Sequence, residues 1–189
     1  MELAKQTLRR QLLKQRTALS KLHGGESSAR VCQHILESEA YKRAQCILGY
    51  LAFGAELNVD EVLRRALKDG KKVCVPYIVS QTVFEAAEIH DLEHFVLDRY
   101  GIRTVAEPVT VLLPGQIDLI LVPGVAFAKK GTRMGMGAGY YDRFLLRVPQ
   151  AELLGIVYEE LLQDSLPYDE YDVLIPYLVT EGGVVQTTC

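Results

Sequence analysis

Apolar residues in this chain follow two spacings, and each spacing predicts a different kind of element. Five stretches are nearly continuous apolar runs, namely residues 46–53, 72–79, 117–127, 153–158 and 173–179. Such runs are typical of strands that are buried on both faces of a sheet, whereas strands with one solvent-exposed face alternate apolar and polar residues. The five runs are therefore predicted to be buried β-strands.

Other stretches repeat apolar residues every three or four positions, as amphipathic helices do. This spacing predicts helices over residues 3–19, 28–40 and 58–68. The segment His23-Gly-Gly-Glu26 should break the chain between the first two. In the third, Asn58 and Glu61 have the spacing of a capping box, and Gly70 is placed to end the helix.

Helical and buried-strand segments alternate along the sequence, which predicts one α/β domain over residues 1–189 with a mainly parallel sheet flanked by helices. Ligands of such sheets bind beyond the carboxyl ends of the strands. The loops after Phe53, Pro76 and Phe127 are therefore expected to meet at one rim. Residues 85–110 are less regular and are interpreted as an excursion rather than a separate domain.

The most informative segment is Gly131-Thr-Arg-Met-Gly-Met-Gly-Ala-Gly-Tyr-Tyr-Asp142, which lies between a predicted strand and a predicted helix start at 140–147. Glycines let the backbone approach an anion, so this order is typical of phosphate sites. Arg133 adds a fork of donors for phosphate, and Asp142 supplies a hard oxygen ligand for Mg²⁺. The segment has neither the P-loop ending nor an evident dinucleotide-site acid. The alternative is a tight turn in which the glycines serve only the backbone.

Cations of the first predicted helix could complete such a site. Lys5 and Arg9 are four residues apart and project from one face, and Arg16 follows near that face. The pair Lys5 and Arg9 would neutralise a triphosphate beside the glycine-rich segment 131–142, called the glycine loop below. The alternative is a solvated basic face of the helix.

Three further positions carry candidate chemistry. Glu56 lies just past a predicted strand end, where a carboxylate can hold a polar heterocycle or orient an amine, or can be an ordinary loop carboxylate. Tyr140 and Tyr141 could stack on a planar ligand or merely pack in the core. Asp172 could be a second metal ligand, although an Asp before a strand is more often turn chemistry.

Composition, charge and motif context argue against several other functions. A net charge of −3 disfavours general nucleic-acid binding, and no apolar run has the length of a membrane span. The N-terminus has no signal-peptide core, so a cytosolic location is expected, with scattered, reduced cysteines at positions 32, 46, 74 and 189. The string His90-Asp-Leu-Glu-His94 resembles a zinc-peptidase motif, but without a third ligand it is interpreted as a solvated helix.

These pieces together resemble the 5-formyltetrahydrofolate cyclo-ligases, also called 5,10-methenyltetrahydrofolate synthetases. The motifs span nearly the whole chain, and they are an N-terminal Lys-x-x-x-Arg helix, a strand-end Tyr-Leu-x(4)-Glu, the highly specific DLILVPGVAFAKKGTRMGMGAGYYDRFL and the weaker LPYDEYDVLIPYLVTE. The resemblance implies a cytosolic α/β enzyme. With ATP and Mg²⁺, such an enzyme converts 5-formyltetrahydrofolate to 5,10-methenyltetrahydrofolate, ADP and phosphate.

The resemblance also implies a role for individual residues. ATP contacts are implied at Lys5, Arg9, Arg133, Met134, Gly135, Met136, Gly137, Ala138, Gly139, Tyr140 and Tyr141. Folate contacts are implied at Leu51, Glu56, Met136, Gly137, Ala138, Gly139 and Tyr140. Asp142 and Asp172 would hold Mg²⁺, and the candidate catalytic residues are Arg133, Glu56 and Tyr140. Reduced folate and ATP are the expected partners of a monomeric protein.

In the route that the family implies, the formyl oxygen attacks the γ-phosphate, N10 then closes the ring, and phosphate departs. No nucleophilic side chain is needed, so positioning and charge neutralisation should supply most of the rate. Five positions depart from the usual family pattern, and they are Tyr77, Thr82, Ala128, Leu161 and Tyr171. They leave two alternatives open: a non-catalytic folate- or nucleotide-binding paralogue, and an ATP-dependent enzyme of the same fold acting on another substrate.

Overall fold

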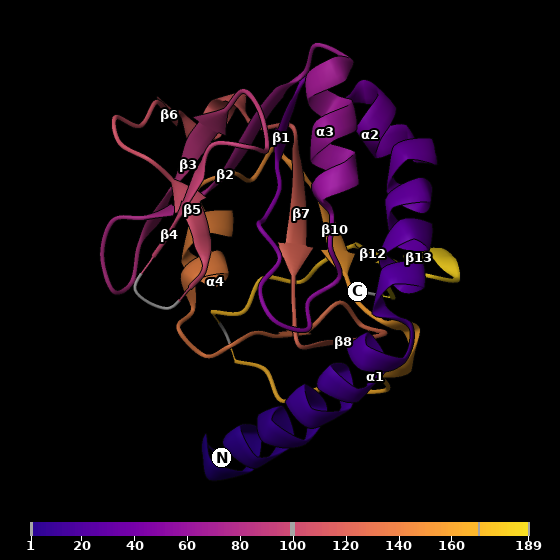
Figure 1. The fold of residues 1–189 in the computed structure, drawn as a ribbon. Helices are drawn as coiled ribbons and strands as arrows, with labels where there is room; N and C mark the ends of the chain where they lie inside the picture. The colour runs from indigo at the N-terminus through magenta and orange to yellow at the C-terminus, as the bar shows by residue number, and fades with distance from the viewer. Residues whose placement is uncertain (1, 99–100, 170, 189) are drawn as a thin grey trace.

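The computed structural model describes residues 2–98, 101–169 and 171–188, and its centre is an eight-stranded sheet (Figure 1). The strands of this sheet are β1 (Cys46–Leu48), β2 (Lys72–Ile78), β3 (Phe84–Ile89), β6 (Val111–Leu112), β7 (Leu119–Pro123), β10 (Glu152–Ile156), β12 (Tyr177–Thr180) and β13 (Gly183–Gln186). Their order is β13-β12-β10-β7-β1-β2-β3-β6. The five strands from β12 to β2 are parallel, and β13, β3 and β6 are antiparallel to their neighbours. The predicted α/β class with a mainly parallel sheet is confirmed.

Helices and two smaller sheets complete the fold. The α-helices are α1 (Glu2–Glu37), α2 (Glu39–Arg43), α3 (Asp60–Lys68) and α4 (Tyr140–Leu145), and the short 3₁₀ helices are η1 (Pro114–Gln116) and η2 (Glu159–Leu161). A three-stranded sheet contains β8 (Ala126–Ala128), β9 (Arg133–Met134) and β11 (Leu162–Gln163), and a hairpin contains β4 (Phe95–Leu97) and β5 (Arg103–Val105). Figure 1 shows α2, α3 and the second half of α1 on one side of the sheet, with α4 on the other.

The apolar runs form buried strands because both faces of the sheet are covered. In β7, the four residues from Leu119 to Val122 have no exposed surface. In Figure 1 the carboxyl end of β7 points toward the first half of α1, which extends past that edge of the sheet. The N-terminal helix therefore lies where ligands of parallel sheets bind.

Several predicted boundaries of strands are wrong, and packing gives the reasons. The predicted strand 117–127 is divided into β7 and β8, because the Phe127 ring folds back over Gly124 and lies 2.4 Å from where a Cβ would be. The predicted strand 46–53 ends at Leu48, although the next residue, Gly49, still donates its N–H to the Cys74 carbonyl oxygen and lies against the Leu63 side chain of α3. The strand predicted at 173–179 begins only after Pro176, a residue that cannot donate to a ladder.

The helix predictions need smaller corrections. The expected break at His23 is a kink inside α1, where the backbone is non-helical (φ −149°, ψ 19°). The predicted helix 28–40 is divided at Ser38, which caps α2 by accepting the Tyr41 N–H. The capping box is wrong, because Asn58 accepts the Asp60 N–H but Glu61 pairs with Arg64 instead.

The remaining segments also differ in part from expectation. The region 85–110 is more regular than predicted, since it contains most of β3 and the β4–β5 hairpin. The string at 90–94 is a bend rather than a helix, in which Asp91 accepts the His94 N–H and contacts its ring Nδ1 at 2.8 Å. Cys32, Cys46 and Cys74 are buried thiols, as expected, and position 189 lies outside the described residues. No helix in the described part of the chain is long and apolar enough to cross a bilayer.

Candidate active site

A cleft of about 620 Å³ opens at the carboxyl edge of the parallel strands. Segments far apart in the sequence contribute to the wall of this cleft. They are the first half of α1, the loop after β1, the end of β2, the β7–β8 connection, the glycine loop with α4, and residues 169, 171 and 172. Of the three loops that were expected to meet, the one after Phe53 contributes Glu56, and the chain past Pro76 contributes Ile78, the last residue of β2. The third contribution comes from Gly124, which precedes Phe127, and residues 129–132 after Phe127 are not in the described lining, so the expectation is confirmed only in part.

The glycine loop is held at its start by close backbone packing. β9 pairs antiparallel with β8, so the chain reverses between them through residues 129–132. At Gly131 the backbone has φ +83°, and an added Cβ would lie 2.6 Å from the carbonyl oxygen of Ile175. The Gly131 carbonyl in turn accepts the Ile175 N–H at 2.9 Å. A glycine is therefore required here for packing as well as for conformation.

This close approach leads to a stability prediction. Gly131→Ala should lower the free energy of unfolding by roughly 1–3 kcal/mol, because it combines positive φ with a backbone clash. The measurement is urea unfolding followed by circular dichroism. Gly115→Ala is the control, since nothing lies within 4 Å of its added Cβ. Equal stability of the two variants would contradict the packing argument.

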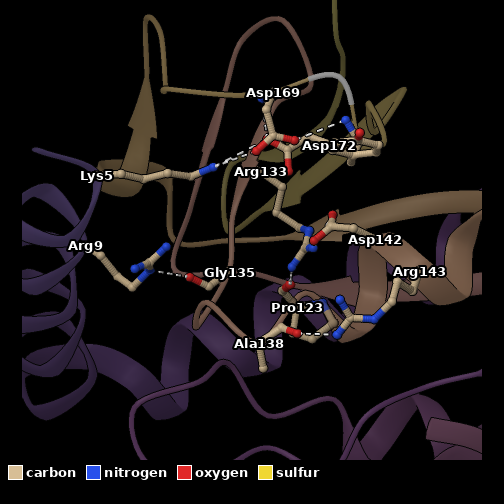
Figure 2. Close-up of polar contacts among 11 residues, drawn as sticks. Lys5, Arg9, Pro123, Arg133, Gly135, Ala138, Asp142, Arg143, Asp169 and Asp172 are labelled. Atoms are coloured by element: carbon tan, nitrogen blue, oxygen red, sulfur yellow. Dashed lines mark hydrogen bonds and ion pairs between the residues drawn. The ribbon is translucent and has the colours of Figure 1, made fainter. Parts of the chain in front are cut away.

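Arg133 and Asp142 form a direct ion pair inside the cleft wall, as Figure 2 shows. The Arg133 Nη2 lies 2.7 Å from the Asp142 Oδ1, and Nη1 is 3.5 Å from the Pro123 carbonyl oxygen. The guanidinium also lies 5.6 Å from the centre of the Tyr141 ring. The Arg133 side chain is only 7% exposed, and its Nε has no hydrogen-bond partner among the described residues. A buried donor of this kind is suited to an anionic ligand.

Two other arginines, Arg9 and Arg143, donate hydrogen bonds to the glycine loop from opposite sides (Figure 2). The Arg9 Nε donates to the Gly135 carbonyl oxygen at 2.9 Å, which ties the loop to α1. Arg143 donates through Nη2 to the carbonyl oxygen of Ala138 and through Nε to that of Thr82. The sequence reasoning missed Arg143, although its place directly after Asp142 in a short helix was a usable signal.

Lys5 and two aspartates form an electrostatic cluster at another part of the cleft. The Lys5 Nζ lies 3.7 Å from carboxylate oxygens of both Asp169 and Asp172. The Asp172 Oδ2 also accepts the Asp169 N–H at 3.0 Å, which is the turn chemistry considered from the sequence. Asp169 was not predicted, and its contact with Lys5 depends on tertiary structure.

Glu56 is a partly buried carboxylate with two stabilising neighbours. Its Oε2 accepts the Phe53 N–H at 3.0 Å, and its Oε1 lies 3.8 Å from the Arg16 Nη1. Burial raises the pKa of Glu56, and the Phe53 N–H and the Arg16 charge act in the opposite direction. Burial also raises the pKa of the Tyr141 hydroxyl, which has no partner within the described residues.

Most of the sequence-predicted site residues line this one cleft. They are Lys5, Arg9, Glu56, Arg133, Gly135, Met136, Gly137, Ala138, Gly139, Tyr140, Tyr141, Asp142 and Asp172. Leu51 and Met134 are buried in the core and are not among the described residues of the lining. The apolar lining from Pro76, Ile78, Phe84 and Leu146 was not predicted, because a buried strand end and a pocket wall look alike in sequence.

The two predicted metal ligands face the same cleft with different neighbours. Arg133 occupies Oδ1 of Asp142, and Asp169 with Lys5 occupies Oδ2 of Asp172, so each carboxylate keeps a second oxygen. In residues 2–98, 101–169 and 171–188, no three His, Cys, Asp or Glu side chains are grouped to hold a metal. Mg²⁺ usually takes one or two carboxylates plus phosphate and water, so this donor set fits Mg²⁺ on a nucleotide rather than a metal held by protein alone.

Comparison with known proteins decides the family. The model of the "5-formyltetrahydrofolate cyclo-ligase family" matches residues 2–181. The chain belongs to this family. A probable 5-formyltetrahydrofolate cyclo-ligase of Caenorhabditis elegans is 29% identical over 193 residues, covering 93% of this chain and 92% of that protein. The 5-formyltetrahydrofolate cyclo-ligase of Escherichia coli K12 is 29% identical over 149 residues, covering 75% and 80%.

Solved structures support the same cyclo-ligase assignment. The NMR structure of Aquifex aeolicus 5,10-methenyltetrahydrofolate synthetase superposes with a TM-score of 0.85 at 28% identity, covering 98% of this chain and 93% of that one. The Mycoplasma pneumoniae 5,10-methenyltetrahydrofolate synthetase gives 0.74 at 26% identity, covering 94% and 98%. The predicted family membership is confirmed.

Proposed function

We propose that this cyclo-ligase family member converts 5-formyltetrahydrofolate to 5,10-methenyltetrahydrofolate. ATP, bound with Mg²⁺, is converted to ADP and phosphate in the reaction. The observation that carries the proposal is that one cleft joins a cation-flanked glycine loop to a partly buried carboxylate and an apolar wall. A nucleotide and a planar folate need to meet in one such space for phosphoryl transfer. One domain and one monomer would suffice.

The glycine loop and its cations form the nucleotide part of this proposal. Arg133 would donate to phosphate through a buried guanidinium, and Lys5 and Arg9 would neutralise further phosphate charge. Asp142 and Asp172 would hold Mg²⁺, which when bound neutralises charge on the transferred phosphoryl group. These residues orient the phosphates and do not themselves form bonds to phosphorus.

Glu56 and the aromatic wall form the folate part. Phe84 packs against Tyr140 and Tyr141, with ring centres 6.4 and 5.2 Å away, so a rigid aromatic surface borders the cleft. Glu56 would accept hydrogen bonds from N–H groups of the folate and fix its register. Tyr140, whose hydroxyl donates to the Ser80 carbonyl, would pack against the ring. The formyl oxygen could then be held in line with the γ-phosphate.

The departures from the family pattern bear on the non-catalytic alternative. Tyr171 lines the cleft, whereas Tyr77, Thr82, Ala128 and Leu161 are not found in its described lining. Ala128 and Leu161 are buried, and the Tyr77 hydroxyl donates to Glu107. Four of the five changes therefore leave the described wall of the cleft intact, which favours an active enzyme over a non-catalytic paralogue.

An absorbance assay tests the proposal directly. Purified protein with 5-formyltetrahydrofolate, Mg²⁺ and ATP should give an ATP-dependent rise in the near ultraviolet, where the methenyl product absorbs. A flat trace from folded protein that still binds ATP would refute this activity and favour the paralogue or another substrate. A substrate panel then separates those two. The cytosolic location stays a prediction for fractionation to test.

A further inference from the structure

Arg16 is the one α1 cation of the cleft that sits deep in its wall. Its side chain is 8% exposed, compared with 21% for Lys5. The Nη1 donates to the Gly124 carbonyl oxygen at 3.2 Å and lies 3.8 Å from the Glu56 Oε1. Arg16 thus joins three segments: α1, the loop after β1 and the β7–β8 connection.

We propose that Arg16 is a positioning residue, which fixes the Glu56 carboxylate at the wall of the cleft in the orientation that receives the folate. This inference rests on the proposed function. Arg16 acts through Glu56, and its charge is held by the Gly124 carbonyl at the point where the predicted strand 117–127 is interrupted. The interruption between β7 and β8 therefore contributes to the site, because it leaves the Gly124 carbonyl oxygen available to orient Arg16.

The geometry favours an arginine at this position. The Glu56 Oε2 is bonded to the Phe53 N–H, so the carboxylate is fixed on one side by its own loop. At 3.8 Å, Arg16 attracts Oε1 without a direct hydrogen bond, which leaves Oε1 able to accept from a ligand. A guanidinium can bond the Gly124 carbonyl and face Glu56 with the same rigid fork.

The electrostatic surroundings of Glu56 agree with this role. Arg16 is the cation whose charge lowers the pKa of Glu56 against the effect of burial. Tyr50 and Tyr141 also face this carboxylate, and burial raises the pKa of both hydroxyls, so they stay neutral. Removing the Arg16 charge should raise the pKa of Glu56 further, because burial favours the protonated form and only the Phe53 N–H would still oppose it. Activity that depends on the ionised Glu56 carboxylate would therefore be lost at a higher pH as the pH is lowered.

The test compares Arg16→Gln with Arg10→Gln, an exposed arginine of the same helix that does not belong to the described lining of the cleft. We expect kcat/KM for 5-formyltetrahydrofolate to fall in Arg16→Gln by up to roughly a hundredfold, with KM for ATP unchanged. The acid limb of the pH profile should move to higher pH. Arg16→Lys should restore the acid limb of the pH profile in part, because lysine keeps the positive charge but lacks the planar guanidinium donors. Arg10→Gln should match the unmodified protein.

A second measurement is independent of turnover. In ligand-free protein, the carboxyl ¹³C resonance of Glu56 should titrate at higher pH in Arg16→Gln than in the unmodified protein or Arg10→Gln. Arg16→Met, which keeps a long stem, replaces Arg16→Gln if that variant does not fold. An unchanged Glu56 titration, or a loss confined to KM for ATP, would overturn the inference. An unmodified protein without turnover would instead refute the proposed function.

Discussion

Arg133→Ala is expected to lower kcat by roughly a thousandfold or more, the scale at which arginines contribute to phosphoryl transfer. Arg133 lines the cleft with a buried guanidinium whose Nε has no partner in the described residues, and one carboxylate, that of Asp142, balances its charge. Its remaining donor capacity can serve phosphate oxygens. Because positioning and charge neutralisation supply most of the proposed catalysis, little activity should survive its removal.

The control for this variant has to show that lost activity is not lost structure. Arg147→Ala removes another arginine paired to a carboxylate, since Arg147 Nη2 lies 2.9 Å from the Glu85 Oε2, but Arg147 is not part of the described cleft lining. Thermal unfolding by circular dichroism should show both variants folded at the assay temperature, with Arg147→Ala active. Arg133→Lys should be intermediate, because it keeps charge without the fork. Near-normal turnover in folded Arg133→Ala would remove the phosphate role.

The sequence predicts the five parallel strands of the central sheet because their signal is local, but it misses the antiparallel strands β3, β6 and β13. Strands such as β7 and β10 are buried on both faces, so their apolar runs stand out against the polar loops. The glycine loop is also predictable from the sequence, since Gly131, Gly137 and Gly139 adopt positive φ values that other residues rarely adopt. The two main parts of the architecture therefore follow from neighbouring residues alone.

The site is less predictable where it depends on contacts distant in sequence. Arg16 and Gly124 are bonded across 108 positions, and nothing near either residue indicates the other. The split of 117–127 into β7 and β8 is hidden for the same reason, because Phe127 packs on Gly124 inside an unbroken apolar run. The sequence indicated Arg133 and Asp142 separately, and the structure pairs them directly, with Arg133 in β9 and Asp142 in α4.

Asp142 could bind Mg²⁺ or could orient Arg133 through their ion pair, and one variant separates these two roles. Asp142→Asn should raise the Mg²⁺ concentration for half-maximal activity by roughly ten- to a hundredfold. The neutral amide oxygen can still accept from the Arg133 Nη2, so the tether to Arg133 is largely kept. It lacks the negative charge that makes a carboxylate a good ligand for Mg²⁺. The measurement is a Mg²⁺ titration of the ATP-dependent absorbance rise.

Asp164→Asn is the matched control for this titration. Asp164 is a highly exposed carboxylate paired with Lys129 at 2.7 Å, and it is outside the described cleft lining. Its variant should show an unchanged Mg²⁺ requirement. If Asp142→Asn lowers kcat but leaves the metal titration unchanged, Asp142 serves to orient Arg133 and is not a metal ligand. A raised Mg²⁺ requirement would instead mean that one carboxylate contacts both charges, with Oδ1 on Arg133 and its second oxygen available to the metal.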